Sequence, residues 1–114
     1  MSCVALALLS ALALPAGAGE SALKNPHQGD AARAEQGRSL FNQYCSHCHA
    51  PNAETADRVR DVRRLRLRYE DRMTEVFWKT VHDGRVDKGM PSWKGVLDDD
   101  TLWTIYTFIQ AVQK

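Results

Sequence analysis

Two cysteines and a histidine within five residues form the part of the sequence best suited to chemistry. The run Cys45-Ser46-His47-Cys48-His49 places two thiols three positions apart, with an imidazole directly after the second. Each thiol can add across one vinyl group of a haem, and the imidazole then lies under the iron as its proximal ligand. The motif therefore predicts one covalently attached haem, bound through Cys45 and Cys48, with His49 as an axial ligand of the iron.

Two other interpretations of this motif are a redox Cys-x-x-Cys pair and one half of a zinc site. A structural zinc ion needs four protein ligands, and the sequence holds no second pair of closely spaced cysteines. Its remaining cysteine, Cys3, lies near the N-terminus. The residue types and spacing favour haem over both alternatives.

A second axial ligand is expected from the run Gly84 to Trp93. Met90 lies there between Gly89 and Pro91, a setting that keeps its backbone out of a helix. A thioether ligand favours ferrous iron and raises the reduction potential of the haem. Methionines are more often core residues, and Met73 is expected to be one because it falls on the apolar face of a predicted helix. Met90 is therefore the candidate sixth ligand.

The N-terminal segment has the pattern of a secretory signal peptide. Residues 4–14 are apolar or small, Pro15 interrupts them, and Ala16-Gly17-Ala18 supplies the small side chains that a signal peptidase accepts. We expect residues 1–18 to be removed after Ala18, and Cys3 with them. The first three residues lack Lys and Arg, so either translation starts upstream or the terminal amine serves as the positive charge. An uncleaved anchor is the less favoured alternative.

Three helices are predicted after a flexible leader at residues 19–30. The first spans residues 31–44 with Asp30 as its N-cap, and a second spans residues 74–83 and ends at Gly84. A third begins at Asp98-Asp99-Asp100, where acidic side chains suit the positive end of a helix. Residues 31–114 are therefore expected to form one small all-α domain.

The faces of these helices give more detailed expectations. Gly37 and Phe41 share one face of the first helix, so the glycine is expected to let another helix approach closely. The last helix carries apolar residues on more than one side and leaves a polar stripe at Thr104, Thr107 and Gln110.

The charges of the chain are nearly balanced overall but concentrated locally. The chain has 15 Lys and Arg against 14 Asp and Glu, which gives no sign of nucleic-acid or membrane binding. Residues 57–72 contain seven arginines, most simply a solvated face. Two alternatives are arginines that pair with haem propionates and a basic patch that steers an acidic redox partner.

Two further expectations concern the surroundings of the haem. Three apolar residues that alternate with arginines in this run, Leu65, Leu67 and Tyr69, are expected to press against the haem or the core. The backbone carbonyl of Pro51 is expected to accept a hydrogen bond from the His49 ring and so fix its orientation.

The order of these features resembles the small monohaem class I c-type cytochromes over residues 31–114. The resemblance implies an all-α fold of three to four helices wrapped around one covalent haem c, with His49 and Met90 as axial ligands. It also implies that the N- and C-terminal helices cross beside the haem at Gly37, Phe41 and Phe108. The arginine-rich run departs from the family, many members of which have a glycine-rich loop there.

The same resemblance implies a periplasmic electron carrier rather than an enzyme. It would accept electrons from a periplasmic dehydrogenase and pass them toward a terminal oxidase, without binding nucleic acid or, after signal cleavage, a membrane. Residues 89–94 and 98–103 are similar to cytochromes that serve quinoprotein alcohol dehydrogenases. Two alternatives are a five-coordinate haem protein, acting as a sensor or small-molecule reductase, and a haem subunit of a stable dehydrogenase complex.

Overall fold

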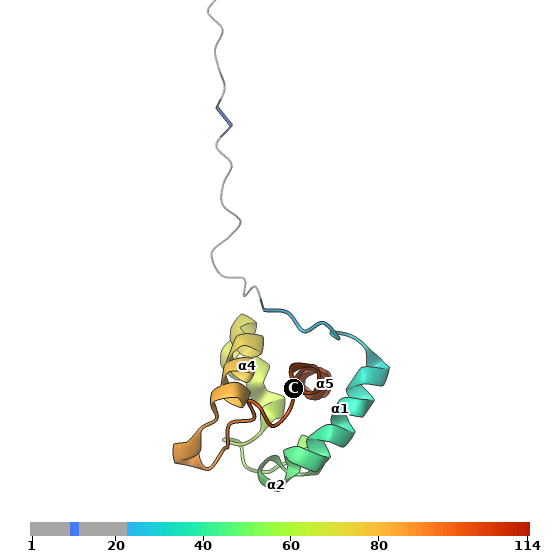
Figure 1. The fold of residues 1–114 in the computed structure, drawn as a ribbon, viewed down its shortest axis with the longest axis vertical. Helices are drawn as coiled ribbons and strands as arrows, with labels where there is room; N and C mark the ends of the chain where they lie inside the picture. The colour runs from blue at the N-terminus through green and yellow to red at the C-terminus, as the bar shows by residue number, and fades with distance from the viewer. Residues whose placement is uncertain (1–9, 12–22) are drawn as a thin grey trace, which may run out of the picture.

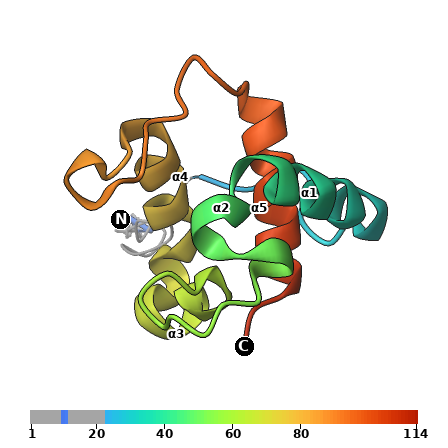
Figure 2. The same ribbon diagram turned by 90° about the horizontal axis from the view of Figure 1, so that it is seen from below.

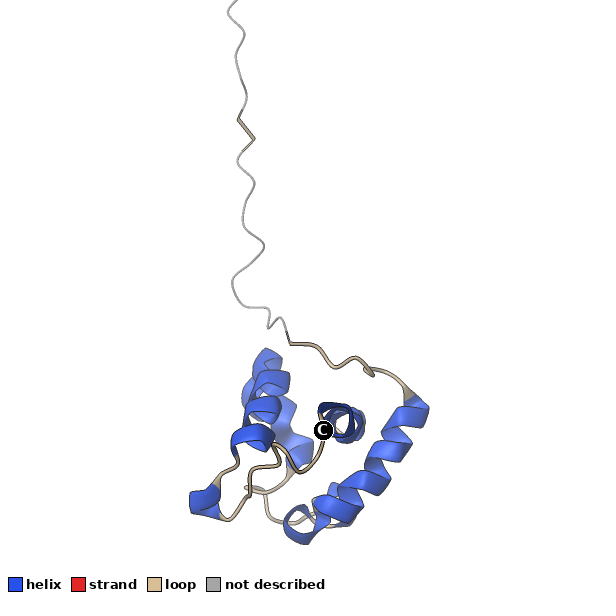
Figure 3. Cartoon of the chain, in the orientation of Figure 1, coloured by secondary structure: helices blue, strands red, loops and turns tan. Residues whose placement is uncertain are grey.

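The computed structural model describes residues 10–11 and 23–114. The expected signal peptide, apart from residues 10–11, and the first part of the leader lie outside the described residues. In the described part the fold is all helical, as predicted, and Figure 3 shows no strand there. None of the described helices is long and apolar enough to cross a bilayer. The α-helices are α1 (Ala31–Tyr44), α2 (Ser46–His49), α3 (Leu65–Tyr69), α4 (Met73–Asp83) and α5 (Asp99–Ala111), and the short 3-10 turns are η1 (Pro51–Ala53), η2 (Val62–Arg64), η3 (Glu70–Arg72) and η4 (Val86–Lys88).

Helix α1 begins and ends at the predicted residues and crosses α5. The Asp30 carboxylate accepts a hydrogen bond of 2.9 Å from the backbone N–H of Arg33, which caps the first turn. Gly37 lies at the crossing, where a Cβ atom would come within 2.0 Å of the Thr104 carbonyl oxygen. Next to it, the rings of Phe41 and Phe108 lie 5.3 Å apart. The predicted close approach of two helices at a glycine is confirmed.

Helix α5 is the centre of the core, with α1 and α4 on opposite sides of it (Figure 1). Its residues from Leu102 to Ile109 are all buried. On the α4 side, Phe77 stacks on Tyr106 with ring centroids 4.5 Å apart, and Trp78 stacks on Trp103 at 3.9 Å. These aromatic pairs hold α4 against α5.

The leader is packed rather than flexible from residue 23 onward, contrary to expectation. Asn25 is buried, and its amide nitrogen donates to Thr107 Oγ1 at 2.9 Å and to Gln110 Oε1 at 2.8 Å. His27 Nε2 lies 2.6 Å from an Asp100 carboxylate oxygen at the start of α5. These contacts tie the segment along α5. The leader sequence alone does not reveal the partners of the Asn25 amide and the His27 imidazole.

The polar stripe predicted for α5 is mostly buried. Thr104 and Thr107 are 3% and 2% exposed, and each hydroxyl donates to a backbone carbonyl one turn earlier, of Asp100 and Trp103 respectively. This local bond lets a threonine lie inside a helix interface at little cost. The stripe faces α1 and the leader rather than water.

Candidate haem-binding site

The Cys-x-x-Cys-His motif forms a single helical turn at the end of α1. The chain leaves α1 through a hydrogen bond of 2.8 Å from the Cys45 N–H to the Phe41 carbonyl, and α2 follows at once. Within the turn, the His49 N–H donates to the Cys45 carbonyl at 3.0 Å. Cys45 and His49 are half-buried, Cys48 is exposed, and all three line one cavity. One turn of helix therefore presents both thiols and the imidazole to the same space.

Two asparagines hold this turn against α1. Asn42 Nδ2 donates to Asn52 Oδ1 at 3.0 Å, and the Asn52 backbone N–H donates to Asn42 Oδ1 at 2.8 Å. Asn52 has φ of 58°, a left-handed conformation that asparagine adopts more readily than most residues. The pair folds the chain back after His49. This pair was not predicted from the sequence, although an asparagine in the turn that follows the motif was a visible signal.

The His49 ring is oriented by a carbonyl other than the predicted one. Its Nδ1 lies 2.7 Å from the backbone oxygen of Arg60, whereas the Pro51 oxygen accepts from the Glu54 N–H. The nomination of Pro51 was wrong, because its carbonyl is used by the 3-10 turn in which it lies. A carbonyl oxygen can only accept, so His49 Nδ1 carries the proton and the lone pair of Nε2 is available for a metal.

The loop that carries Met90 is fastened to the end of α4. Arg85 and Met90 exchange two backbone hydrogen bonds, of 2.8 and 3.0 Å, and the Trp93 N–H donates to the Val81 carbonyl at 2.8 Å. Gly84, at φ +71°, permits this contact, since a Cβ atom there would lie 2.6 Å from the Ser92 nitrogen. The backbone around Met90 is therefore held in place from both sides.

One cavity brings the motif and Met90 together. It encloses about 720 Å³, within the range of about 300 to 1,000 Å³ usual for cofactor sites. Met90 lines it, whereas Met73 is buried in the core at 5% exposure, as predicted. In Figure 2, α2 lies in front of α5, with α3 and α4 on one side and α1 on the other. Apolar side chains that line the cavity are Phe41, Val59, Val62, Leu65, Val76, Phe77, Val81, Trp93, Leu97, Leu102, Ile105 and Ile109.

The arginine-rich run forms part of this wall and part of the surface. Leu65 packs against the core and Tyr69 is half-buried at the cavity, as expected, but Leu67 is 57% exposed. The prediction that Leu67 presses against the haem or the core was wrong. Leu65–Tyr69 is a short helix, and residues two positions apart in a helix do not share a face. Arg60 and Arg68 also reach the cavity.

The charges around the cavity suit a ligand that carries carboxylates. Four basic residues line it: Arg60, Arg68, Arg85 and Lys88. The single lining carboxylate in the described part, Asp61, already binds Arg63, with Oδ1 2.8 Å from Nε and Oδ2 3.0 Å from Nη2. These hydrogen bonds hold the pKa of Asp61 below its usual value. A largely apolar wall with an excess of cations fits a haem, which has an apolar plate and two propionates.

The surroundings of the motif affect the Cys45 thiol and, within the described residues, leave too few ligands for zinc. Burial, with a smaller effect of the neighbouring Cys48, raises the pKa of the Cys45 thiol to about 12, so before attachment this thiol is protonated at neutral pH. Within the described residues, no group of three or more His, Cys, Asp and Glu side chains is placed to hold a metal ion. The described residues therefore supply no zinc site.

Two known proteins are similar to this chain, each over only part of its own length. Cytochrome c550 of Pseudomonas aeruginosa is 28% identical over 92 residues, which cover 78% of this chain and 62% of the relative. Quinohemoprotein alcohol dehydrogenase ADH-IIG of Pseudomonas putida is 29% identical over 80 residues, 70% of this chain but 11% of that protein. No solved structure matches the chain.

A family model covers most of the folded part. Residues 32–109 match the model described as cytochrome c oxidase, cbb3-type, subunit III. The match includes the motif, the Met90 loop and nearly all of α5. The chain therefore belongs to the c-type cytochromes, electron-transport proteins whose cofactor is a covalently attached haem c.

Proposed function

We propose that this protein is a periplasmic electron carrier whose haem is bound through Cys45 and Cys48 and whose iron is held by His49 and Met90. The observation that carries the proposal is that the motif and Met90, from separate segments of the chain, line the same cavity. Bound haem would supply an iron that changes between Fe(III) and Fe(II), and His49 and Met90 would hold it in both states.

The roles of the individual side chains follow from their surroundings. The Arg60 carbonyl keeps the His49 proton on Nδ1, which directs Nε2 toward the iron and makes the imidazole a stronger ligand. The fastened backbone of the Met90 loop limits movement of the thioether. The apolar part of the wall would reduce contact between water and a bound haem, and this would favour the ferrous state, which carries less charge. Each contribution favours rapid one-electron transfer without loss of a ligand.

The proposed partners are redox proteins. The similarity to part of a quinohemoprotein alcohol dehydrogenase suggests a periplasmic dehydrogenase of that class as the electron donor, with a terminal oxidase as the eventual acceptor. Exposed arginines of the run 57–72, namely Arg58, Arg60, Arg66, Arg68 and Arg72, provide positive charge that would attract an acidic partner. Residues 1–18 are proposed to direct export to the periplasm, with cleavage after Ala18.

Substitution of Met90 tests the ligand assignment. We expect Met90→Ala to lose the weak near-infrared band that reports sulfur bound to ferric iron, to lower the reduction potential and to bind cyanide more readily. Met73→Leu is the matched control, because Met73 is buried in the core and its replacement should leave the band intact. A Met90→Ala protein whose spectrum equals that of the unsubstituted protein would instead favour the five-coordinate sensor or reductase.

A further inference from the structure

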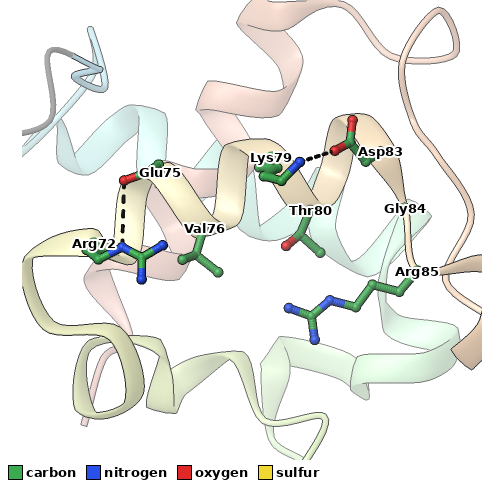
Figure 4. A pocket seen from close by; sticks show the side chains of 8 residues that line it. All are labelled: Arg72, Glu75, Val76, Lys79, Thr80, Asp83, Gly84 and Arg85. Carbon is green, nitrogen blue, oxygen red and sulfur yellow. Dashed lines mark hydrogen bonds and ion pairs between the residues drawn. The ribbon is translucent and has the colours of Figure 1, made fainter.

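Arg85 occupies the boundary between the haem cavity and a second depression. A groove of about 350 Å³ runs along one side of α4 and shares Val76, Thr80 and Arg85 with the larger cavity. Figure 4 shows the Arg85 side chain extending back beneath Thr80 toward Val76, so that its guanidinium lies under α4. A ligand carboxylate at this position would lie at the edge of the cavity and keep contact with solvent.

Arg85 differs from the other arginines of the groove and the cavity in lacking a partner. In the groove, Lys79 Nζ lies 2.7 Å from Asp83, and Arg72 Nε lies 3.8 Å from Glu75 (Figure 4). In the cavity, Arg60 pairs with Asp57 and Arg68 donates to the Val59 carbonyl. Among the described residues, the Arg85 guanidinium makes no hydrogen bond and no ion pair. Lys88 shares this property but offers a point charge, whereas a guanidinium binds a carboxylate through two parallel hydrogen bonds.

The backbone of Arg85 links this charge to Met90. Its N–H donates to the Met90 carbonyl at 2.8 Å, and its own carbonyl accepts from the Met90 N–H at 3.0 Å. The two residues form an isolated antiparallel bridge at the base of the loop. A ligand that fixes the Arg85 side chain therefore also limits movement of the backbone that presents the methionine.

We propose that Arg85 binds a propionate of the haem and, through its backbone bridge to Met90, holds the methionine loop in the position needed for iron ligation. Arg85 is thus a positioning residue. The proposal rests on the proposed function in assigning Met90 to the iron. It places the carboxylate contact outside the arginine-rich run 57–72, at the residue that directly follows α4 and Gly84.

Two variants of Arg85 and one control test this proposal at equal covalent haem content. Arg85→Gln removes both the charge and the paired N–H donors of the guanidinium, whereas Arg85→Lys keeps the charge alone. The control, Arg72→Gln, removes a charge that lies in the same groove but outside the cavity. The measurements are the midpoint potential and the affinity of ferric iron for cyanide, which must displace Met90. The backbone bridge remains possible in every variant, so a purely structural role of the loop predicts no change.

The expected result is a lower potential and tighter cyanide binding in Arg85→Gln. An unpaired propionate stabilises ferric iron, and we expect the equilibrium constant for reduction to fall about three- to tenfold, tenfold being about 59 mV for one electron. Cyanide should bind roughly threefold tighter or more because the methionine loop is less restrained. Arg85→Lys should keep most of the potential yet resemble Arg85→Gln in cyanide binding.

Two outcomes would overturn the proposal. If Arg85→Gln and Arg72→Gln behave alike in both measurements, Arg85 does not bind the propionate; if the potential falls but cyanide affinity is unchanged, the link to Met90 is refuted. Both conclusions apply when the unsubstituted protein shows the sulfur-to-iron band. Absence of that band would instead refute the proposed ligation by Met90, and with it the positioning role.

Discussion

The two sides of α5 are built in different ways. On one side, α1 and the leader close against the helix through contacts that the chain makes with itself, at Gly37, Phe41 and Asn25. On the other side, the loops before α3 and after α4 and the inner faces of these helices surround a cavity of about 720 Å³. We refer to the first as the scaffold side and to the second as the haem side.

This difference shows where the cofactor contributes to stability. The cavity of about 720 Å³ opens to solvent and has a largely apolar wall, so without haem these apolar side chains would be in contact with water. The haem side therefore depends on the haem to cover its apolar wall, although α4 also packs directly on α5, whereas the scaffold side closes through protein contacts alone.

The largest expected effect comes from preventing haem attachment. In the double substitution Cys45→Ser and Cys48→Ser, we expect the haem side to lose its ordered structure and the chain to lose most of its stability. Amide hydrogen exchange measured by mass spectrometry should show residual protection in α1, in α5 and in α4, which stacks on α5, with α3 and the loop at residues 84–97 exchanging fast. Equal loss of protection in both regions would show that the scaffold side does not hold together by itself.

A substitution at the helix crossing tests the scaffold side directly. In Gly37→Ala, the new methyl group would collide with the Thr104 carbonyl, and we expect a loss of about 3 kcal/mol measured by urea unfolding of the haem-loaded protein. Alanine is otherwise the better helix former by about 1 kcal/mol, so destabilisation isolates the close approach. Ser39→Ala, at an exposed position of α1, should change stability by less than about 0.5 kcal/mol.

Acid titration gives the smallest expected effect and tests an ion pair of the haem side. Hydrogen bonds from Arg63 hold the pKa of Asp61 below its ordinary value of 3.8. The pair therefore contributes its full stabilisation above that pH and loses it as the pH falls through the lowered pKa. Urea unfolding between pH 6 and pH 2 should show a steeper loss of stability for the unsubstituted protein than for Asp61→Asn. Asp71→Asn, at an exposed carboxylate, should follow the unsubstituted protein; equal slopes for all three would contradict the role of the pair.

Features set by local sequence were predicted well. The bounds of α1, its Asp30 cap and the end of α4 at Gly84 follow from capping and periodicity within a few residues. The close approach at Gly37 was also predictable, because a glycine on the apolar face of a helix is costly unless another helix fills the space. The motif carries its own spacing, so the proposed haem site could be assigned to residues 45–49 without tertiary information.

Features set by distant contacts were not predicted. The partner of Asn25 lies 82 residues away in α5, and the carbonyl that orients His49 belongs to Arg60, beyond the turn at Pro51. In both cases the choice among many possible polar partners depends on how segments meet in the folded chain. Leu67 shows the same limit, since three alternating apolar residues fit a strand and a short helix equally well.

The absorption spectrum of the haem-loaded protein, oxidised and reduced, tests the central claim most directly. We predict sharp reduced bands, haem that stays with the chain after denaturation, and a near-infrared sulfur-to-iron band in the oxidised form. Together these would identify an iron held by His49 and Met90 in a covalently bound haem. Covalent haem without the sulfur band would contradict ligation by Met90, and a colourless protein from a host able to attach haem would contradict the account as a whole.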